Sequence, residues 1–178
     1  MTDYRDLWYQ SPDGLKLYAR DYPGPAGCTL SPALCMHGLT RNSADFAVLA
    51  DQLSNRRRVL SVDQRGRGRS DYDSNIANYT PVTYVQDMFT LLDSEGIDRV
   101  VLVGTSMGGL MSFLMAAMQP ERIAAMIIND IGPEISPAGI ERVKEYTGRV
   151  PPVSSWDEAA AQSKEIYGEW LPGLSDED

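Results

Sequence analysis

A single serine, Ser106, lies in the glycine-rich segment Gly104–Gly109, which reads Gly-Thr-Ser-Met-Gly-Gly. The preceding Val100–Val103 is an apolar run typical of a buried strand, and the following Leu110–Met118 has the composition of a helix. Glycines on both sides let a strand turn sharply into a helix, because the backbone there passes too close for a Cβ. Such a turn exposes the hydroxyl and aims the helix N-terminus at a developing anion. The pattern predicts that the Ser106 hydroxyl lies above the sheet, beside a helix N-terminus that could stabilise an anion.

Other kinds of chemistry find little support. The chain has one histidine, His37, and two cysteines, Cys28 and Cys35, so it lacks the cluster of ligands that a zinc site needs. The alternating arginines of residues 65–69 suggest a phosphate site, but the segment has only two glycines and opens no helix directly. We therefore expect neither a metal nor an organic cofactor.

The elements around Ser106 predict an α/β fold. Apolar runs that are uniform rather than alternating, separated by segments of helical period, are typical of a mostly parallel sheet covered on both faces. The alternation that follows the Pro12–Gly14 turn predicts an antiparallel hairpin at the start of the sheet. Strands are expected at 15–22, 33–36, 59–62, 100–103 and 123–128, and helices at 44–53 with Ser43 as N-cap, at 81–96 after Thr80, and at 107–118 as a buried helix.

After Gly132 the alternation of apolar runs and helical segments ends, and only helical segments follow. Two amphipathic helices are expected, at 135–148 and 155–171, and no strand follows them. Strand 123–128 would then form an unpaired apolar edge of the sheet. We therefore divide the chain into a core, 1–133, and an incomplete helical lid or cap segment, 134–178.

At this point the chain resembles the α/β-hydrolase family, serine-nucleophile branch, over the N-terminal part of that fold. Besides the turn at Ser106, Leu34–Leu39 resembles the family's oxyanion loop, Ser61–Asp71 its Asp-x-Arg-Gly-x-Gly-x-Ser turn, and Asn129–Pro133 the end of its sixth strand. The resemblance implies a doubly wound, mostly parallel sheet that lacks the C-terminal strands, followed by two lid-like helices.

The resemblance also implies roles for individual residues. Ser106 would be the nucleophile, and the backbone N–H groups of Leu39 and Met107 would form the oxyanion hole. A serine at position 106, rather than an aspartate, argues against the dehalogenase and epoxide-hydrolase branches. The implied reaction is hydrolysis of an ester, a lactone or a related acyl or C–C bond substrate, without a cofactor.

One departure from the family limits this interpretation. In the family the triad runs Ser, then Asp or Glu, then His, but no histidine follows Ser106 in this chain. His37 precedes the serine, where the family's histidine braces the oxyanion loop, and Asp130 is only a weak candidate for the triad acid. The simplest expectation is that the chain is truncated before the triad acid and histidine, and is inactive or weakly active as given.

Net charge and hydropathy limit the kinds of partner that the chain could bind. The chain carries 16 Lys and Arg against 25 Asp and Glu, a net charge of −9, which opposes nucleic-acid binding. No apolar run is long enough to span a membrane, and Met1–Gln10 lacks the features of a signal peptide. We expect a cytoplasmic protein that acts on a small acyl substrate.

Three readings stay open. The first is a serine hydrolase whose acid and histidine lie outside this chain. The second is a non-catalytic pseudoenzyme or ligand-binding module that self-associates through its open sheet edge. The third is an enzyme that uses His37 as its base. Trp156, Tyr167 and Trp170 would either line a substrate entrance or form the seam between lid and core.

Overall fold

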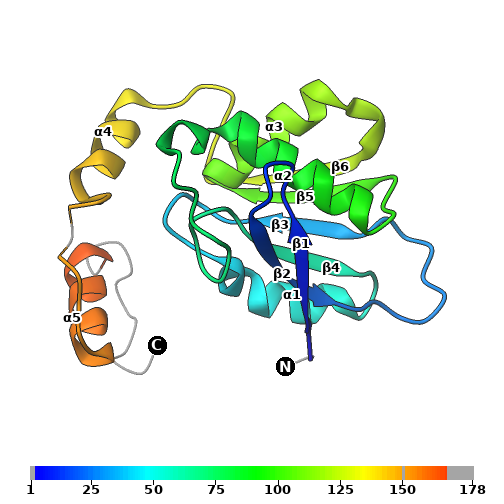
Figure 1. The fold of residues 1–178 in the computed structure, drawn as a ribbon, viewed down its shortest axis with the longest axis horizontal. Helices are drawn as coiled ribbons and strands as arrows, with labels where there is room; N and C mark the ends of the chain where they lie inside the picture. The colour runs from blue at the N-terminus through cyan, green and yellow to red at the C-terminus, as the bar shows by residue number, and fades with distance from the viewer. Residues whose placement is uncertain (1–2, 150, 168–178) are drawn as a thin grey trace. The chain divides into compact units, whose positions relative to one another are not determined.

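The computed structural model describes residues 3–149 and 151–167 and has the α/β architecture that the sequence predicts. Its sheet has six strands in the order β1-β2-β4-β3-β5-β6 (Figure 1). β1 and β2 form an antiparallel hairpin and β2 pairs antiparallel with β4, while the remaining pairs are parallel. The strands are β1 (Arg5–Gln10), β2 (Lys16–Tyr22), β3 (Ala33–Met36), β4 (Val59–Asp63), β5 (Val100–Thr105) and β6 (Ile123–Asn129).

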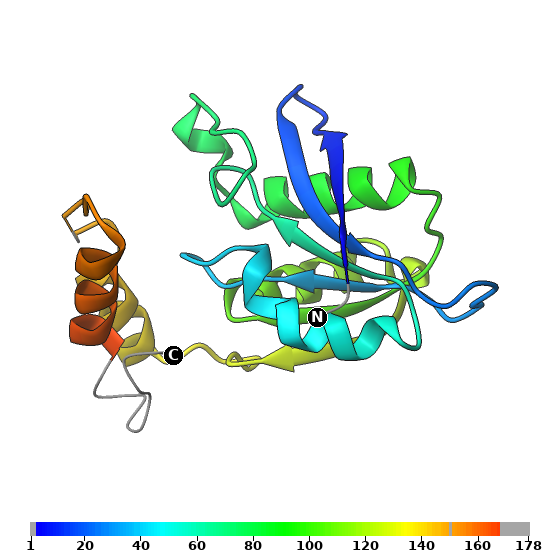
Figure 2. The same cartoon turned by 90° about the horizontal axis from the view of Figure 1, so that it is seen from below.

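Helices cover both faces of this sheet. α1 (Ala47–Ser54) lies on one face, and α2 (Pro81–Ser94) and α3 (Met107–Met118) lie on the other (Figures 1 and 2). Successive residues of the buried strand β3 point alternately into two separate hydrophobic clusters, one on each face. A strand buried on both faces has no polar side to present, which explains its uniform apolar sequence.

Two local predictions were wrong. Ser43 does not cap a helix from 44, because a 3-10 turn, Ser43–Phe46, precedes α1 and its cap is the side chain of Asn42, which accepts from the N–H of Ala44. Ser43 is instead buried, and its N–H donates to the carboxylate of Asp63. α3 is not buried all round, since Met111 and Met115 are buried but Met118 is 48% exposed.

β6 forms one edge of the sheet, and among the described residues its strand partner is β5 alone. The strand carries no charged residue, yet Met126 and Ile127 are 40% and 56% exposed. An apolar, open edge of this kind is able to pair with a further strand.

The chain divides into two compact units, which meet between Glu134 and Ile135. The second unit contains α4 (Pro137–Tyr146) and α5 (Trp156–Tyr167); the residues 168–171 that we assigned to the latter helix lie outside the described residues. The start of α5 is a reciprocal cap, because Ser155 Oγ accepts from the N–H of Glu158 and that residue's carboxylate accepts from the N–H of Ser154. No helix in the described ranges has the length and hydropathy to cross a bilayer.

The start of α2 offers a test of its predicted cap. Thr80 Oγ1 accepts from the N–H of Thr83 and Pro81 occupies the first turn. We expect Thr80→Ala to lower the free energy of unfolding by about 1 kcal/mol in urea denaturation. Thr90→Ala is the matched control, because the Thr90 hydroxyl donates to Gln86 O on the exposed face of the same helix and alanine is the better helix former there. An equal loss in both variants would contradict the cap.

Candidate active site

Ser106 lies on a sharp turn between β5 and α3 (Figure 1). Its φ of 51° and ψ of −111° fall in a region that non-glycine residues rarely occupy. The turn requires glycine on both sides: a Cβ at Gly104 would lie 2.3 Å from Gly108 O, and one at Gly108 would lie 1.9 Å from Met36 O. The Ser106 N–H donates to Asn129 O at 2.9 Å, which ties the turn to the end of β6. Strain of this kind is typical of functional residues.

The loop after β3 passes directly beside this serine. A Cβ built on Gly38 would lie 3.7 Å from the Ser106 Cβ, so position 38 lies beside the serine. Residues 38–41 form a tight turn in which the N–H of Arg41 donates to Gly38 O at 3.2 Å. The structure thus brings together two segments that are about seventy residues apart in the sequence.

The backbone amides of Leu39 and Met107 share one property. Throughout the described ranges, neither N–H donates a hydrogen bond to a backbone or side-chain acceptor. Met107 begins α3, where the first N–H groups have no partner within the helix. Amides without a protein acceptor are free to donate to a developing oxyanion.

His37 is buried, and both ring nitrogens contact backbone. Nδ1 lies 2.6 Å from Gly38 O and Nε2 lies 3.2 Å from the N–H of Gln64. A carbonyl must accept and an N–H must donate, so the ring is neutral with its proton on Nδ1. Since neither nitrogen is left for Ser106, the possibility that His37 is the general base is not supported by this geometry.

Ser106 itself has no activating partner in the part of the chain that the structure describes. Its hydroxyl makes no hydrogen bond there, and it is partly exposed. Asp130 also has a positive φ, of 57°, but its side chain is exposed and makes no hydrogen bond to another described residue. A serine without a base is a weak nucleophile.

From the sequence, Asp63 and Arg65 are expected to cap and pair within their own turn; for Arg65 this expectation is wrong. Its side chain is 1% exposed and pairs with Asp13, Asp73 and Asp87, which come from three other segments. Asp63, by contrast, does cap its turn, since its carboxylate accepts from the N–H of Arg69 as well as from Ser43. No local pattern indicates the Arg65 cluster, because Asp87 and Asp13 lie 22 and 52 residues away in the sequence.

The burial of His37 predicts a pH dependence of stability. Burial lowers the pKa of His37 below its ordinary 6.5, opposed by the hydrogen bond to Gly38. Its contribution to stability is therefore complete above pH 6.5 and is lost as the pH falls through the lower pKa of the folded state. Because the chain has one histidine, its C2–H NMR signal reports this pKa directly, with the urea-unfolded chain as control. A folded pKa at or above 6.5 would contradict the burial argument.

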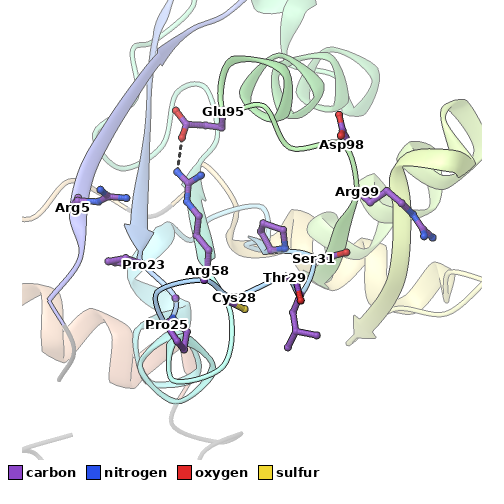
Figure 3. Close-up of a pocket in the computed structure, with 14 residues that line it drawn as sticks. Arg5, Pro23, Pro25, Cys28, Thr29, Ser31, Arg58, Glu95, Asp98 and Arg99 are labelled. Carbon is purple, nitrogen blue, oxygen red and sulfur yellow. Dashed lines mark hydrogen bonds and ion pairs between the residues drawn. The ribbon is translucent and has the colours of Figure 1, made fainter.

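An open groove of about 700 Å³ lies at the opposite end of the sheet from Ser106 (Figure 3). It is lined by residues that precede β3 and β5, whereas Ser106 follows β5. Its most buried cation, Arg58, already forms ion pairs with Asp21 and Glu95. The Arg58 guanidinium is therefore not available to bind an anionic ligand in the groove. No group of three or more potential metal ligands is found within the described ranges.

The aromatic residues assigned to a substrate entrance or seam are only partly described. Trp156 is 90% exposed within the second unit. The side chain of Tyr167 and the whole of Trp170 lie outside what the structure describes. The choice between entrance and seam therefore stays a prediction.

Comparison with known proteins adds independent findings. A family model described as "alpha/beta hydrolase fold" matches residues 32–177. The chain is 34% identical over 157 residues to a 3-hydroxybutyrate-oligomer hydrolase of Cupriavidus necator, covering 88% of the chain and 53% of that protein. It is 34% identical over 103 residues to esterase YbfF of Escherichia coli, covering 58% of the chain and 39% of that protein.

The solved structures include a close match. An alpha/beta hydrolase from Novosphingobium aromaticivorans is 44% identical, with a TM-score of 0.92 over 99% of the chain and 61% of that protein. The chain thus spans about half the length, or less, of the curated relatives just described.

Proposed function

This chain belongs to the alpha/beta hydrolase family, and on that premise we propose that it is a serine-dependent hydrolase of an ester, a lactone or a related acyl or C–C bond substrate. The observation that carries the proposal is the strained turn at Ser106, flanked by the unpaired amides of Leu39 and Met107. The hydrolase and esterase names of the relatives agree with this class of reaction.

In the proposed mechanism Ser106 Oγ attacks the carbonyl carbon of the substrate and its proton passes to a general base. The carbonyl electrons move to the oxygen, where the N–H groups of Leu39 and Met107 donate to it. Each such donor typically contributes roughly 2.7–4 kcal/mol to transition-state stabilisation. Collapse of the intermediate expels the protonated leaving group and forms an acyl-serine, which water hydrolyses by the same steps in reverse order.

The base of this mechanism would come from outside the 178 residues. His37, the one histidine of the sequence, has both ring nitrogens occupied. The Asp130 side chain makes no hydrogen bond to another described residue that would mark it as the acid. The curated relatives extend well beyond the matched region, which leaves room for both residues. In the same proposal, helices α4 and α5 belong to a lid.

The names of the relatives favour an ester substrate. One relative is named for oligomers of 3-hydroxybutyrate and another as an esterase. We therefore propose a small ester of a short acid, and no metal or organic cofactor. The test is hydrolysis of p-nitrophenyl acetate and of 3-hydroxybutyrate oligomers by the chain, and by the longer product of the same reading frame if it supplies a histidine after Ser106. A folded longer product without turnover of either would contradict the proposal.

A second candidate function follows from the open edge of β6. A non-catalytic module that keeps the pocket would pair this apolar strand with a second copy of the chain. Sedimentation analysis separates the two readings, because self-pairing predicts a dimer that dissociates on dilution. A monomer at all concentrations would exclude this version.

A further inference from the structure

Arg67 lies in the loop after β4, where its N–H donates to Gln64 O at 2.9 Å, and its side-chain contacts are unusual for a surface arginine. Nε donates to Leu39 O at 3.1 Å, and Nη1 donates to Arg65 O at 2.9 Å and to the hydroxyl of Tyr84 at 3.0 Å. The guanidinium also lies over the Tyr84 ring, 5.1 Å from its centre. Within the described residues it makes no ion pair. Its hydrogen bonds therefore hold backbone and a tyrosine rather than a carboxylate.

The backbone that Arg67 holds is the turn carrying one of the unpaired amides. The N–H of Leu39 and the carbonyl of Gly38 belong to one planar trans peptide, so fixing the carbonyl fixes the direction of the N–H. His37 Nδ1 and the N–H of Arg41 both donate to that carbonyl. Arg67 holds the carbonyl of the next peptide, Leu39 O. Two consecutive peptides of the turn are thus held, the first by the neighbouring residues His37 and Arg41 and the second by Arg67 from another loop.

We infer that Arg67 is a positioning residue for the oxyanion donor, which it orients by anchoring the turn at 38–41 to the loop after β4 and to α2. The inference rests on the proposed function, in which the Leu39 N–H receives the oxyanion. Tyr84 is the second part of the anchor, because it is 3% exposed in α2 and fixes the guanidinium in turn. A donor displaced by about 1 Å loses much of its value in the transition state while substrate binding changes little.

Arg69 provides a matched control in the same loop. It is also an arginine and also contacts aromatic rings, those of Trp8 and Tyr18, but its ion pair is with Asp6 of β1. It makes no hydrogen bond to the turn at 38–41. Removal of its guanidinium therefore tests for general effects of losing a charge and a cation–π contact.

The first measurement does not depend on catalysis. In the 178-residue chain, the amide of Arg41 reports closure of the turn, because it donates to Gly38 O. We expect Arg67→Met to speed hydrogen exchange at this amide by tenfold or more, and Arg69→Met to change it less than twofold. If Arg67→Met fails to fold, Tyr84→Phe decides, since it removes one hydrogen bond of the anchor and predicts a smaller increase confined to the same turn. Exchange unchanged in the folded variants would overturn the inference.

The second measurement separates positioning from mere stability. Acylation of Ser106 by p-nitrophenyl acetate, followed as the mass of the acyl-protein, is expected to slow about tenfold in Arg67→Met with little change in the ester concentration at half-saturation. Arg67→Lys should not restore it, because an ammonium lacks the fork that reaches both carbonyls. If the unaltered 178-residue chain is not acylated, the same comparison is made in the longer product that supplies a histidine after Ser106. If a folded longer product is not acylated either, the proposed function fails, and hydrogen exchange alone decides the role of Arg67. Acylation in Arg67→Met equal to that of Arg69→Met would refute the positioning role.

Discussion

Replacing Ser106 by alanine is expected to abolish acyl-protein formation from p-nitrophenyl acetate. In a protein complete with its general base, kcat should fall on the order of 10⁶-fold, as for removal of a serine nucleophile in a serine protease. The physical reason is that Ser106 is the one residue between β5 and α3, whereas the neighbouring hydroxyl, that of Thr105, belongs to β5 and accepts from Asn129 Nδ2 at 3.5 Å. Intact-mass spectrometry and steady-state kinetics measure the two effects. Acylation that persists in Ser106→Ala would assign the reaction to another residue.

The same position links activity to strain in the backbone. Alanine and glycine both remove the hydroxyl of Ser106, but only glycine adopts a φ of 51° without steric cost. We therefore expect Ser106→Gly to be more stable than Ser106→Ala by about 1 kcal/mol, after the greater unfolded-state entropy of glycine is deducted. Urea denaturation of both variants measures the difference. A glycine variant that is less stable than the alanine variant would mean that the turn is relaxed.

The elements of the fold that the sequence predicted best are those whose signals are local. The apolar run Val100–Val103 forms most of the strand that it predicts, β5. The predicted cap Thr80 directly precedes the helix that it caps, α2. The turn at Ser106 was found for the same reason, because its glycines adjoin it. Where a partner is distant in the sequence, the prediction failed. Ser43 was given to a helix start because its bond to Asp63, twenty residues away, leaves no local signal.

The candidate site shows the same limit at finer scale. Ser106 and Met107 were predicted as site residues from one short segment, Gly104–Gly109. Leu39 was predicted from the resemblance of a second segment, Leu34–Leu39, to the oxyanion loop. The resemblance also indicated that His37 braces the loop, and its ring contacts Gly38 O. What no local pattern indicates is that an arginine from beyond β4 holds the same turn. Side-chain to backbone contacts between loops depend on the sheet order that brings the loops together, which the sequence leaves open.

Arg65 should carry the largest single contribution to stability among the charged residues described. The side chains of Arg65 and Asp87 are each 1% exposed, and two hydrogen bonds, of 2.8 and 2.7 Å, join them. Asp13 and Asp73 complete the cluster and bring the turn after β1 and the loop before α2 against the same guanidinium. Removing one partner of a buried ion pair leaves an uncompensated charge, so Arg65→Met should cost about 3–5 kcal/mol of unfolding free energy.

The control is Arg69→Met, four residues along the same loop, which removes an ion pair whose two side chains are about half exposed. Such exposed ion pairs contribute little to the free energy of unfolding. The urea concentration at the unfolding midpoint of this variant should therefore be close to that of the unaltered chain. Equal losses in Arg65→Met and Arg69→Met would mean that the buried cluster has no special role and that any cation removed from this loop is equally costly.

The pH dependence of Arg65→Met identifies the cause of its loss. Burial raises the pKa of Asp87, and Arg65 opposes that rise. Without the arginine the pKa of the folded variant climbs further above the unfolded value. A group whose folded pKa is raised contributes most to stability below its unfolded pKa and loses that contribution as the pH rises.

The stability deficit of Arg65→Met should therefore shrink as the pH falls from 7 toward 4, because Asp87 takes up a proton. Below its ordinary pKa of 3.8 the Asp13 carboxylate adds to the same trend, because Arg65 lowers its pKa to about 2 and the unaltered chain alone loses that stabilisation as the pH falls toward 2. Urea titrations at each pH, with Arg69→Met alongside, measure the deficit; one that grows in acid would show that an unpaired buried Asp87 is not the source of the loss.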